Sequence, residues 1–256
     1  MSTTVKIMTM NIGNPSIERA RKQIEWIKNR NEDIFVLTET KNSAGCALIE
    51  EVFSEHRLDG VQSNINVVFP RSATKDLGVM CLSKYPIKKT EFAFKETNQY
   101  YSRYLYNEIS LYKQKIKTVG LYVPSRNQTP EKIIRKKNFL EQTINSLKKL
   151  PRKSTIVCGD FNIVDRDHIP HYNTFKKWEY LFYDQLIELG YVDAFKKCNP
   201  GVQEYSWVGR TNSGYRYDYC FVSSDIQEQI VDCYFVHDTR NMRLTDHSAL
   251  VVELSL

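Results

Sequence analysis

The sequence has no apolar run long enough to cross a membrane. Its longest apolar stretches, such as Ile34–Leu37 and Thr118–Val123, have the length of single strands, whereas a membrane-spanning helix needs roughly 18 to 20 apolar residues. The segment Met1–Met10 includes serine, threonine and lysine and never builds the apolar core of a secretory signal. We therefore expect a cytoplasmic protein with no membrane partner.

Cysteines at metal-binding spacing are also missing. The six cysteines are scattered singly, with no Cys-x-x-Cys pair and no histidine pair at zinc-finger spacing. Several stand in apolar segments such as Thr155–Cys158 and Asp218–Val222, where a free thiol behaves as a small buried hydrophobe. The pattern argues against structural zinc and predicts reduced cysteines in the core.

The chain shows no low-complexity segment, no internal repeat and no linker in which proline and glycine gather. Its 256 residues are 41% hydrophobic and 26% charged, which is typical of a globular protein. We therefore expect one domain spanning residues 1–256. The 36 lysines and arginines exceed the 30 aspartates and glutamates, and the net charge of +6 favours a polyanionic partner without identifying it.

Apolar periodicity predicts many strands and few helices. The expected strands are Val5–Met10, Ile34–Thr38, Asn64–Phe69, Leu77–Ser83, Tyr104–Leu111, Ile116–Val123, Ser154–Cys158, Tyr205–Val208, Tyr215–Ser223, Ile230–Val236 and Ala249–Leu254. The expected helices are Pro15–Arg30 capped by Asn14, Cys46–His56, Pro130–Leu150 capped by Thr129, and Thr174–Leu189 closed by Gly190. Short turns between neighbouring strands favour stacked sheets flanked by helices, an α/β sandwich.

Polar residues stand where the apolar strands end. Carboxylates and a histidine gathered on one sheet edge make a site for a hard cation such as Mg²⁺, which keeps water and substrate oxygens as ligands. Each motif alone is weak, because a Gly-Asp-x-Asn segment is most often a turn and an Asp-His pair is most often at the surface. The residues in question are Asn11, Glu39, Asp160, Asn162, Asp218, Asp246 and His247.

Taken in order, these motifs resemble the endonuclease/exonuclease/phosphatase superfamily, and within it exonuclease III and the related abasic-site endonucleases. The matching segments are Thr9–Asn11, Leu37–Lys41, Gly78–Lys84, Leu121–Pro124, Gly159–Asn162, Val192–Phe195, Tyr205–Trp207, Arg216–Tyr219 and Thr245–Ser248. The resemblance implies a four-layer α/β/β/α sandwich of two mixed sheets flanked by helices. It also implies Mg²⁺-dependent hydrolysis of DNA, as an abasic-site endonuclease, a 3′-5′ exonuclease or both, in DNA repair.

The resemblance assigns metal binding to residues at the ends of the first strands and before the last. Glu39 is expected to bind Mg²⁺ directly, with Asn11 at the metal or fixing the glutamate, and Asp246 to serve a second or alternative metal position. Mn²⁺ is expected to replace Mg²⁺. Whether the mechanism uses one metal ion or two stays open.

The resemblance also assigns the groups that act on the phosphate. Asp160 is the candidate general base or water orienter, and Asn162 aims its amide at the same water or at a phosphate oxygen. Tyr122 places a phenol on the phosphate. His247 contacts the phosphate while Asp218 holds its ring, the role that a carboxylate plays for an imidazole.

Substrate binding falls to aromatic residues and to basic residues in loops. Trp207, Tyr215 and Tyr217 match the wall of a pocket for a flipped sugar, although aromatics in strands are often core residues. Arg126 is a candidate phosphate contact, or else part of an exposed loop. The other basic candidates on the active-site edge are Lys41, Arg71, Lys75, Lys84, Arg210 and Arg243.

Other polar residues are expected to face solvent without a role. His168 and His171 flank Pro170 in a polar loop, and we expect both to be exposed. The densest basic region leads into the start of the strand whose far end carries Asp160, so we expect a solvated helix face there. Its members are Lys132, Arg135, Lys136, Lys137, Lys148, Lys149, Arg152 and Lys153.

The chain departs from the abasic-site enzymes in two places. They carry Gly-Leu-Arg where this chain has Gly13–Pro15, and a longer basic loop where it has Val208–Gly214. Both departures affect DNA binding more than chemistry, so reaction type is better determined than substrate. The alternatives are a relative that acts on RNA or on a phosphoinositide or other lipid phosphoester, and a non-catalytic nucleic-acid-binding module. We expect a monomer.

Overall fold

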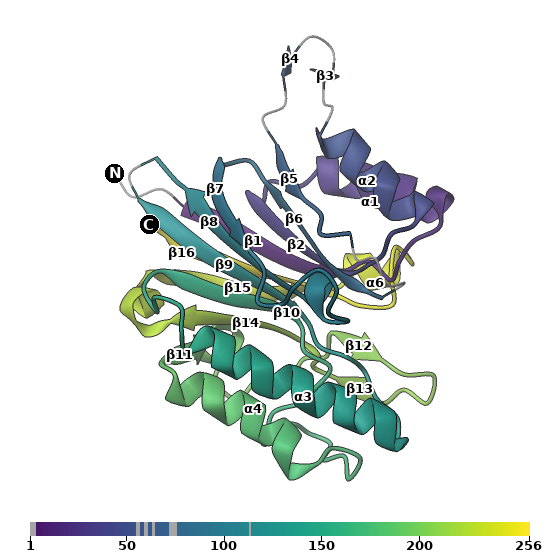
Figure 1. The fold of residues 1–256 in the computed structure, drawn as a ribbon, viewed down its shortest axis with the longest axis vertical. Helices are drawn as coiled ribbons and strands as arrows, with labels where there is room; N and C mark the ends of the chain where they lie inside the picture. The colour runs from purple at the N-terminus through teal and green to yellow at the C-terminus, as the bar shows by residue number, and fades with distance from the viewer. Residues whose placement is uncertain (1–3, 55–56, 59–60, 63–64, 72–75, 113) are drawn as a thin grey trace.

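Two six-stranded mixed sheets pack face to face, and helices cover both outer surfaces (Figure 1). This computed structural model describes residues 4–54, 57–58, 61–62, 65–71, 76–112 and 114–256. The arrangement confirms the predicted four-layer α/β/β/α sandwich. No helix in the described part of the chain is long and apolar enough to cross a membrane.

The first sheet is formed by the two ends of the chain and the segments that follow the first strand. Its strands, in order across the sheet, are β15 (Ile230–Val236), β16 (Ala249–Ser255), β1 (Thr4–Asn11), β2 (Ile34–Thr40), β6 (Gly78–Ser83) and β5 (Asn66–Val68). Helices α1 (Ile17–Lys28) and α2 (Ala44–Ser54) lie on its outer face (Figure 1).

The second sheet comes from the middle of the chain. Its strands, in order, are β11 (Tyr191–Asp193), β14 (Asp218–Ser223), β10 (Thr155–Asp160), β9 (Lys115–Tyr122), β8 (Tyr104–Ser110) and β7 (Ile87–Glu91). Helices α3 (Pro130–Leu147) and α4 (Lys177–Glu188) cover its outer face (Figure 1). The smaller elements are α5 (Ala194–Cys198), α6 (Asp238–Asn241), the pair β12 (Trp207–Val208) and β13 (Gly214–Tyr215), the pair β3 (Arg57–Leu58) and β4 (Val61–Gln62), and 3-10 turns at Tyr101–Arg103 and Ser224–Gln229.

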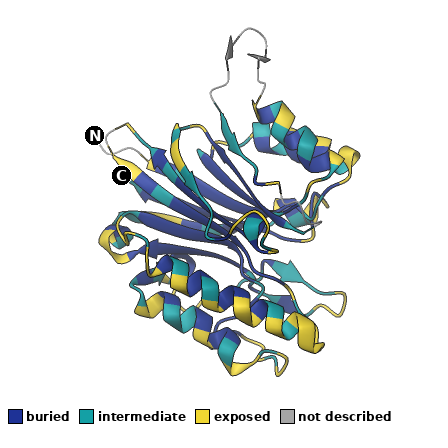
Figure 2. Cartoon of the chain, viewed as in Figure 1, coloured by how far each residue is buried: buried dark blue, intermediate teal, exposed yellow. Residues whose placement is uncertain are grey.

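The strands are buried on both faces because they lie between another sheet and a layer of helices (Figure 2). In β1, Val5 and Ile7 belong to the core between the sheets, whereas Met8 and Met10 belong to the core under α1 and α2. At Gly120 the sheets approach so closely that a Cβ atom would lie 2.7 Å from Val79 Cγ1. The six cysteines are free and five are buried, as predicted, while Cys198 is half-buried.

Several helix ends differ from the sequence prediction. The predicted cap Asn14 is wrong, because its backbone is left-handed (φ 40°) and its Oδ1 accepts a hydrogen bond from Ser43 Oγ (2.8 Å). Ser16 caps α1 instead, accepting from the backbone N–H of Arg19. Thr129 precedes α3 but makes no capping bond with its side chain, and α4 begins at Lys177, three residues after Thr174.

The strand predictions were mostly correct, with local differences. The predicted strand Tyr215–Ser223 is divided into β13 and β14, and the prediction had no place for β7, β11, α5 or α6. Helix α3 ends at Leu147 instead of Leu150. His56, at the predicted end of the second helix, and Asn64, at the start of a predicted strand, lie outside the described residues.

A buried ion cluster joins α3, α4 and the loop after β9. Lys136 on α3 donates to Glu179 Oε1 on α4 (2.6 Å), and the guanidinium of Arg126 pairs with Glu179 Oε2. The expectation that Lys136 is exposed is therefore wrong. In the basic region of residues 132–153, all the other lysines and arginines except Arg135 are exposed. Burial lowers the pKa of Lys136, and the charge of Glu179 opposes that effect.

Removing the shared carboxylate of this cluster should destabilise the protein strongly. Glu179→Ala leaves two buried cations unpaired, so we expect a loss of about 3–5 kcal/mol in the free energy of unfolding, measured with urea. The matched control is Asp184→Ala on the same helix, whose pair with Arg166 is much more exposed and should contribute less than about 1 kcal/mol. Equal effects of the two substitutions would contradict the assignment.

Candidate active site

Strand register brings three of the predicted residues into one row of the second sheet. Asp160, the last residue of β10, pairs with Tyr122 on β9 and with Asp218 on β14. All three side chains are buried. The row therefore places two carboxylates and a phenol beside one another at one edge of the sheet.

Asn11 connects this row to the first sheet. Its Nδ2 donates to Asp160 Oδ2 (2.9 Å) and lies 3.4 Å from His247 Nε2. Its Oδ1 accepts from the backbone N–H of Gly13 (2.9 Å). The amide is fully buried and held on both sides, so it fixes the separation of the two sheets at the site.

Glu39 reaches the same row from β2. Its backbone is left-handed (φ 55°) at an irregularity in the pairing of β2 with β6, between Thr38 and Thr40. Its Oε1 accepts a hydrogen bond from the Tyr122 hydroxyl (2.8 Å). Burial, followed by the charges of Glu39 and Asp160, raises the pKa of Tyr122 well above 10, so the phenol acts as a donor.

His247 and Asp218 form a buried pair. His247 Nδ1 lies 2.7 Å from Asp218 Oδ2, which leaves Nε2 facing Asn11. Burial alone would lower the pKa of His247, but the charge and hydrogen bond of Asp218 outweigh it and raise this pKa to about 9. Asp218 thus contacts the imidazole ring, and its orienting role stays a prediction.

The carboxylates crowd one another. Burial raises the pKa of Asp160, and the nearby charge of Asp218 raises it further. Asp218 Oδ1 is buried and has no hydrogen-bond partner among the described residues. This donor set, of carboxylates, an amide and an orphaned carboxylate oxygen, fits a hard divalent cation that keeps several water ligands. The described residues contain no tight group of three His, Cys, Asp or Glu side chains of the kind that encloses a metal ion.

Two of the predicted residues are engaged differently from our expectation. The Asn162 Nδ2, which we expected to face water or phosphate, donates to the Val123 carbonyl (3.0 Å), while its backbone N–H donates to Asp160 Oδ1 (2.9 Å). Asp246 is exposed, and its Oδ2 accepts from Trp207 Nε1 (2.9 Å). Asp246 thereby joins Trp207 to the His247 loop.

The three predicted aromatic residues lie together beside the row of Tyr122, Asp160 and Asp218. Trp207 pairs with Tyr215 across β12 and β13 and forms an isolated bridge with His247. Tyr215 stacks on Tyr217 with ring centroids 5.1 Å apart. A pocket of about 290 Å³ is lined by these two tyrosines, by Phe175 and, on the catalytic side, by Asn162. All three rings are half-buried and lie outside the core. Tyr215 and Tyr217 form a wall of this pocket, and Trp207 packs against both tyrosines without lining it.

His168 supports this wall, and the expectation that it is exposed is wrong. It is buried, its Nε2 accepts from the backbone N–H of Arg216 (3.2 Å), and its ring lies against Tyr215. Burial lowers the pKa of His168, which keeps Nε2 free to accept. His171 is exposed, as expected.

Arg216 was missed by the sequence analysis. It lies between Tyr215 and Tyr217 in the sequence, and its side chain is buried. Its guanidinium donates to Asp165 Oδ2 (2.7 Å) and Asp193 Oδ2 (2.8 Å). The available signal was an arginine inside an otherwise aromatic strand, which needs buried carboxylate partners.

The basic residues predicted to contact phosphate differ in whether they form ion pairs. Arg126 and Arg71 are held in ion pairs with Glu179 and Glu50, so neither is a free cation. Lys75 lies outside the described residues. The remaining candidates on the active-site loops, Lys41, Arg210 and Arg243, have no ion pair with any described carboxylate.

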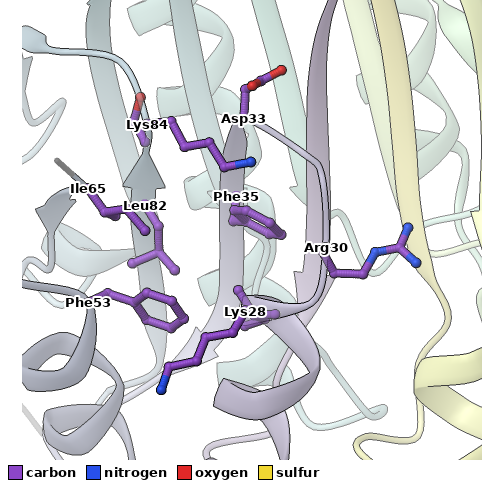
Figure 3. Close-up of a pocket in the computed structure, with 10 residues that line it drawn as sticks. Lys28, Arg30, Asp33, Phe35, Phe53, Ile65, Leu82 and Lys84 are labelled. Carbon is purple, nitrogen blue, oxygen red and sulfur yellow. The ribbon is translucent and has the colours of Figure 1, made fainter. Parts of the chain in front are cut away.

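Lys84 lies at the wrong end of the sheet. It follows β6 and its backbone N–H donates to the carbonyl of Asp33, which precedes β2, whereas Glu39 lies near the other end of β2. There it lines a pocket of about 200 Å³ with Phe35 and Phe53 (Figure 3). This pocket is mainly apolar, and it is not the catalytic centre because the polar row is at the opposite edge.

The chain matches the model of the Endonuclease/Exonuclease/phosphatase family over residues 8–247. It belongs to this family. It is 27% identical over 139 residues to an exodeoxyribonuclease of Bacillus subtilis, a match that covers 48% of this chain and 55% of that protein. The chain therefore spans about half the length of this curated relative.

Two solved structures share the fold across nearly the whole chain. An AP endonuclease from Archaeoglobus fulgidus superposes with a TM-score of 0.82 at 24% identity, covering 98% of this chain and 100% of that one. A 3′-5′ exonuclease (NExo) from Neisseria meningitidis gives a TM-score of 0.82 at 19% identity with the same coverage. At these identities the similarity establishes the fold.

The contact between His247 and Asp218 should be detectable in the titration of His247. Because its folded-state pKa of about 9 lies above the ordinary 6.5, protonated His247 stabilises the fold fully below pH 6.5 and loses this effect as pH rises through 9. Asp218→Asn should lower the pKa of His247 by at least about one unit, measured by NMR with EDTA present. The exposed His171 is the internal reference, and an unchanged His247 titration would exclude Asp218 as its partner.

Proposed function

We propose that the protein is a Mg²⁺-dependent phosphodiester hydrolase that acts on DNA, as an abasic-site endonuclease, a 3′-5′ exonuclease or both, in DNA repair. The observation that carries this proposal is the convergence of Asn11, Glu39, Asp160, Asp218 and His247 at one sheet edge. We further propose that residues 1–256 act as a single catalytic domain and as a monomer.

Mg²⁺ is assigned to Glu39 and Asn11, with Asp246 as a second or alternative position. The ion supplies positive charge for the phosphate oxygens and can be replaced by Mn²⁺. Glu39 is suited to this role because its left-handed backbone and the Tyr122 hydroxyl fix its direction. Asp246 is suited to a peripheral role because it is exposed and tied to Trp207.

The remaining residues are assigned to the attacking water and to the phosphate. Asp160, held by Asn11 and by the backbone of Asn162, takes the proton of the attacking water. Protonated His247 contacts the phosphate and places positive charge on it as negative charge develops. Tyr122, whose hydroxyl proton is donated to Glu39 Oε1 in this structure, is assigned to the same phosphate through its phenol.

DNA is favoured as the substrate by the aromatic wall and by the relatives. Half-exposed rings beside a phosphate site suit a nucleotide or a bare sugar drawn out of the helix. The similar proteins are named as an AP endonuclease and as exonucleases. RNA and lipid phosphoesters are the alternative substrates. A binding module without catalysis is disfavoured because it gains nothing from carboxylates clustered against phosphate.

Phosphodiesterase activity should disappear with EDTA and return with Mg²⁺ or Mn²⁺. Asp160→Asn keeps the shape of the site but removes the charge that activates water, and should reduce the rate at least ~100-fold. The control Asp184→Asn removes a carboxylate from the surface of α4 and should leave the rate unchanged. Near-full turnover by Asp160→Asn in metal would remove Asp160 from the mechanism.

A substitution at the aromatic wall can distinguish abasic-site recognition from 3′-5′ exonuclease activity. Trp207→Ala should slow incision at an abasic site more than removal of a normal 3′ nucleotide, by about 1–2 kcal/mol of differential transition-state binding. Trp207→Phe is the matched control, since it keeps an aromatic ring, although a smaller one, and loses the hydrogen bond to Asp246. Equal proportional losses of both activities in folded Trp207→Ala would favour a less selective nuclease.

A further inference from the structure

A groove lies between α3 and α4, the two helices that cover the outer face of the second sheet (Figure 1). It has a volume of about 470 Å³. Leu140 and Ile144 of α3 and Phe182 of α4 line it and are buried, so its floor is apolar. Trp178 and Leu181 of α4 also line it. The groove is thus an apolar hollow on an outer surface of the molecule.

Two of the apolar side chains in this groove are available to a partner. Leu181 is 48% exposed, and Trp178 is half-buried. The guanidinium of Arg126 lies 5.6 Å from the centroid of the Trp178 ring, which holds the indole in place before a partner binds. Pre-positioned aromatic side chains next to apolar surface are typical of the residues that contribute most to protein binding.

The charged residues of the groove lie along α3. Lys137 and Lys148 line it and are exposed, and neither pairs with a carboxylate in the described part of the chain. They are 11 positions apart, which corresponds to about 16 Å of helix. Glu141 lines the groove between them. The groove is therefore basic at both ends, whereas its middle is apolar with one acidic group.

We propose that this groove binds a short amphipathic helix of a partner protein, with large apolar side chains on one face and acidic residues at both ends. The apolar face of a helix fits a groove of this kind through side chains at positions i, i+3, i+4 and i+7. Acidic ends complement Lys137 and Lys148, and this complementarity fixes the position of the helix along the groove. A helix of about three turns spans the distance between the two lysines.

The groove is separate from the site that acts on phosphate. It shares no lining residue with the pocket of about 290 Å³ that Tyr215 and Tyr217 line. Its Lys148 end leads to Thr155, the first residue of β10, whereas Asp160 is the last residue of that strand, roughly 17 Å away. A bound helix can therefore attach the protein to a partner while the active-site edge stays open. The inference goes beyond the proposed function and does not depend on it.

The test is the binding of synthetic peptides to the full chain, measured by fluorescence anisotropy. The first peptide forms an amphipathic helix with leucines at i, i+3, i+4 and i+7 and glutamates at both ends. The second has lysines in place of the glutamates, and the third has asparagines in place of the leucines. The first peptide should bind, and each of the others should bind at least about tenfold more weakly.

Substitutions on α4 test the apolar part of the groove. Leu181→Asp places a charge there and should weaken binding of the first peptide at least about tenfold, and Trp178→Ala should do the same. The matched control is Ile187→Asp on the same helix, which changes a residue that is 45% exposed but does not line the groove. It should leave binding unchanged. Leu181→Asp should leave DNA hydrolysis at the level of the wild type.

Substitutions of lysines test the basic ends. Lys137→Glu combined with Lys148→Glu should invert the preference, so that the peptide with lysine ends binds more tightly than the peptide with glutamate ends. Lys132→Glu combined with Lys153→Glu makes the same change in net charge at exposed positions that do not line the groove. This control should keep the preference of the wild type.

The outcomes distinguish the possible occupants of the groove. Failure of the first peptide to bind the wild type overturns the proposal, and so does equal binding of the three peptides. Thermal unfolding identifies any variant that is not folded, and Leu181→Asp then decides the question because it changes an exposed side chain.

Two other occupants are tested with the same variant. Leu181→Asp can instead weaken binding to phosphatidylglycerol vesicles, or self-association in sedimentation, while the first peptide does not bind. Either result assigns the groove to a membrane or to a second copy of the chain and overturns the proposal. A wild type that binds the peptide but does not hydrolyse DNA supports the docking site and contradicts only the proposed function.

Discussion

The concentration of negative charge at one sheet edge is the constraint on which the site depends. Asp160 and Asp218 are adjacent in register, and Glu39 joins them through Tyr122, with protonated His247 as the nearest positive charge. Burial, followed by the like charge of Asp218, raises the pKa of Asp160, so without a further cation this carboxyl group tends to hold its own proton. A divalent ion favours the ionised form. This crowding of carboxylates is the reason why the proposed function places a divalent cation at this edge of the sheet.

The sheets hold this arrangement in place. Gly120 allows the two sheets to approach closely in the core, and the Asn11 amide bridges them at the edge by donating to Asp160. Side chains on strand ends have little freedom because packing fixes the strands behind them. The polar groups of the row accordingly come from strand ends, whereas His247 comes from the loop before β16 and Trp207 and Tyr215 come from the short strands β12 and β13.

Much of the fold and of the catalytic row follows from the sequence. Apolar strands predict the sheets, and polar residues after them predict the edge at which Asn11, Glu39 and Asp160 meet. The partner of a side chain across the fold does not follow. From the sequence, Arg126 is a candidate phosphate contact. In the structure it is paired with Glu179, which lies 53 residues later in the chain. His168 reads as exposed for the same reason, because Arg216 and Tyr215 bury it from a distant segment.

This difference explains why reaction type is better determined than substrate. The row of Tyr122, Asp160 and Asp218 lies at strand ends, and the strand pattern of the sequence already predicts where those ends are. The position of the aromatic wall depends on a series of tertiary contacts. Arg216 is held by Asp165 and Asp193, His168 accepts from the Arg216 backbone, and Tyr215 lies against His168. A change anywhere along that chain moves the wall without moving the carboxylates. Substrate preference can therefore change within this fold while the chemistry of the strand ends stays the same.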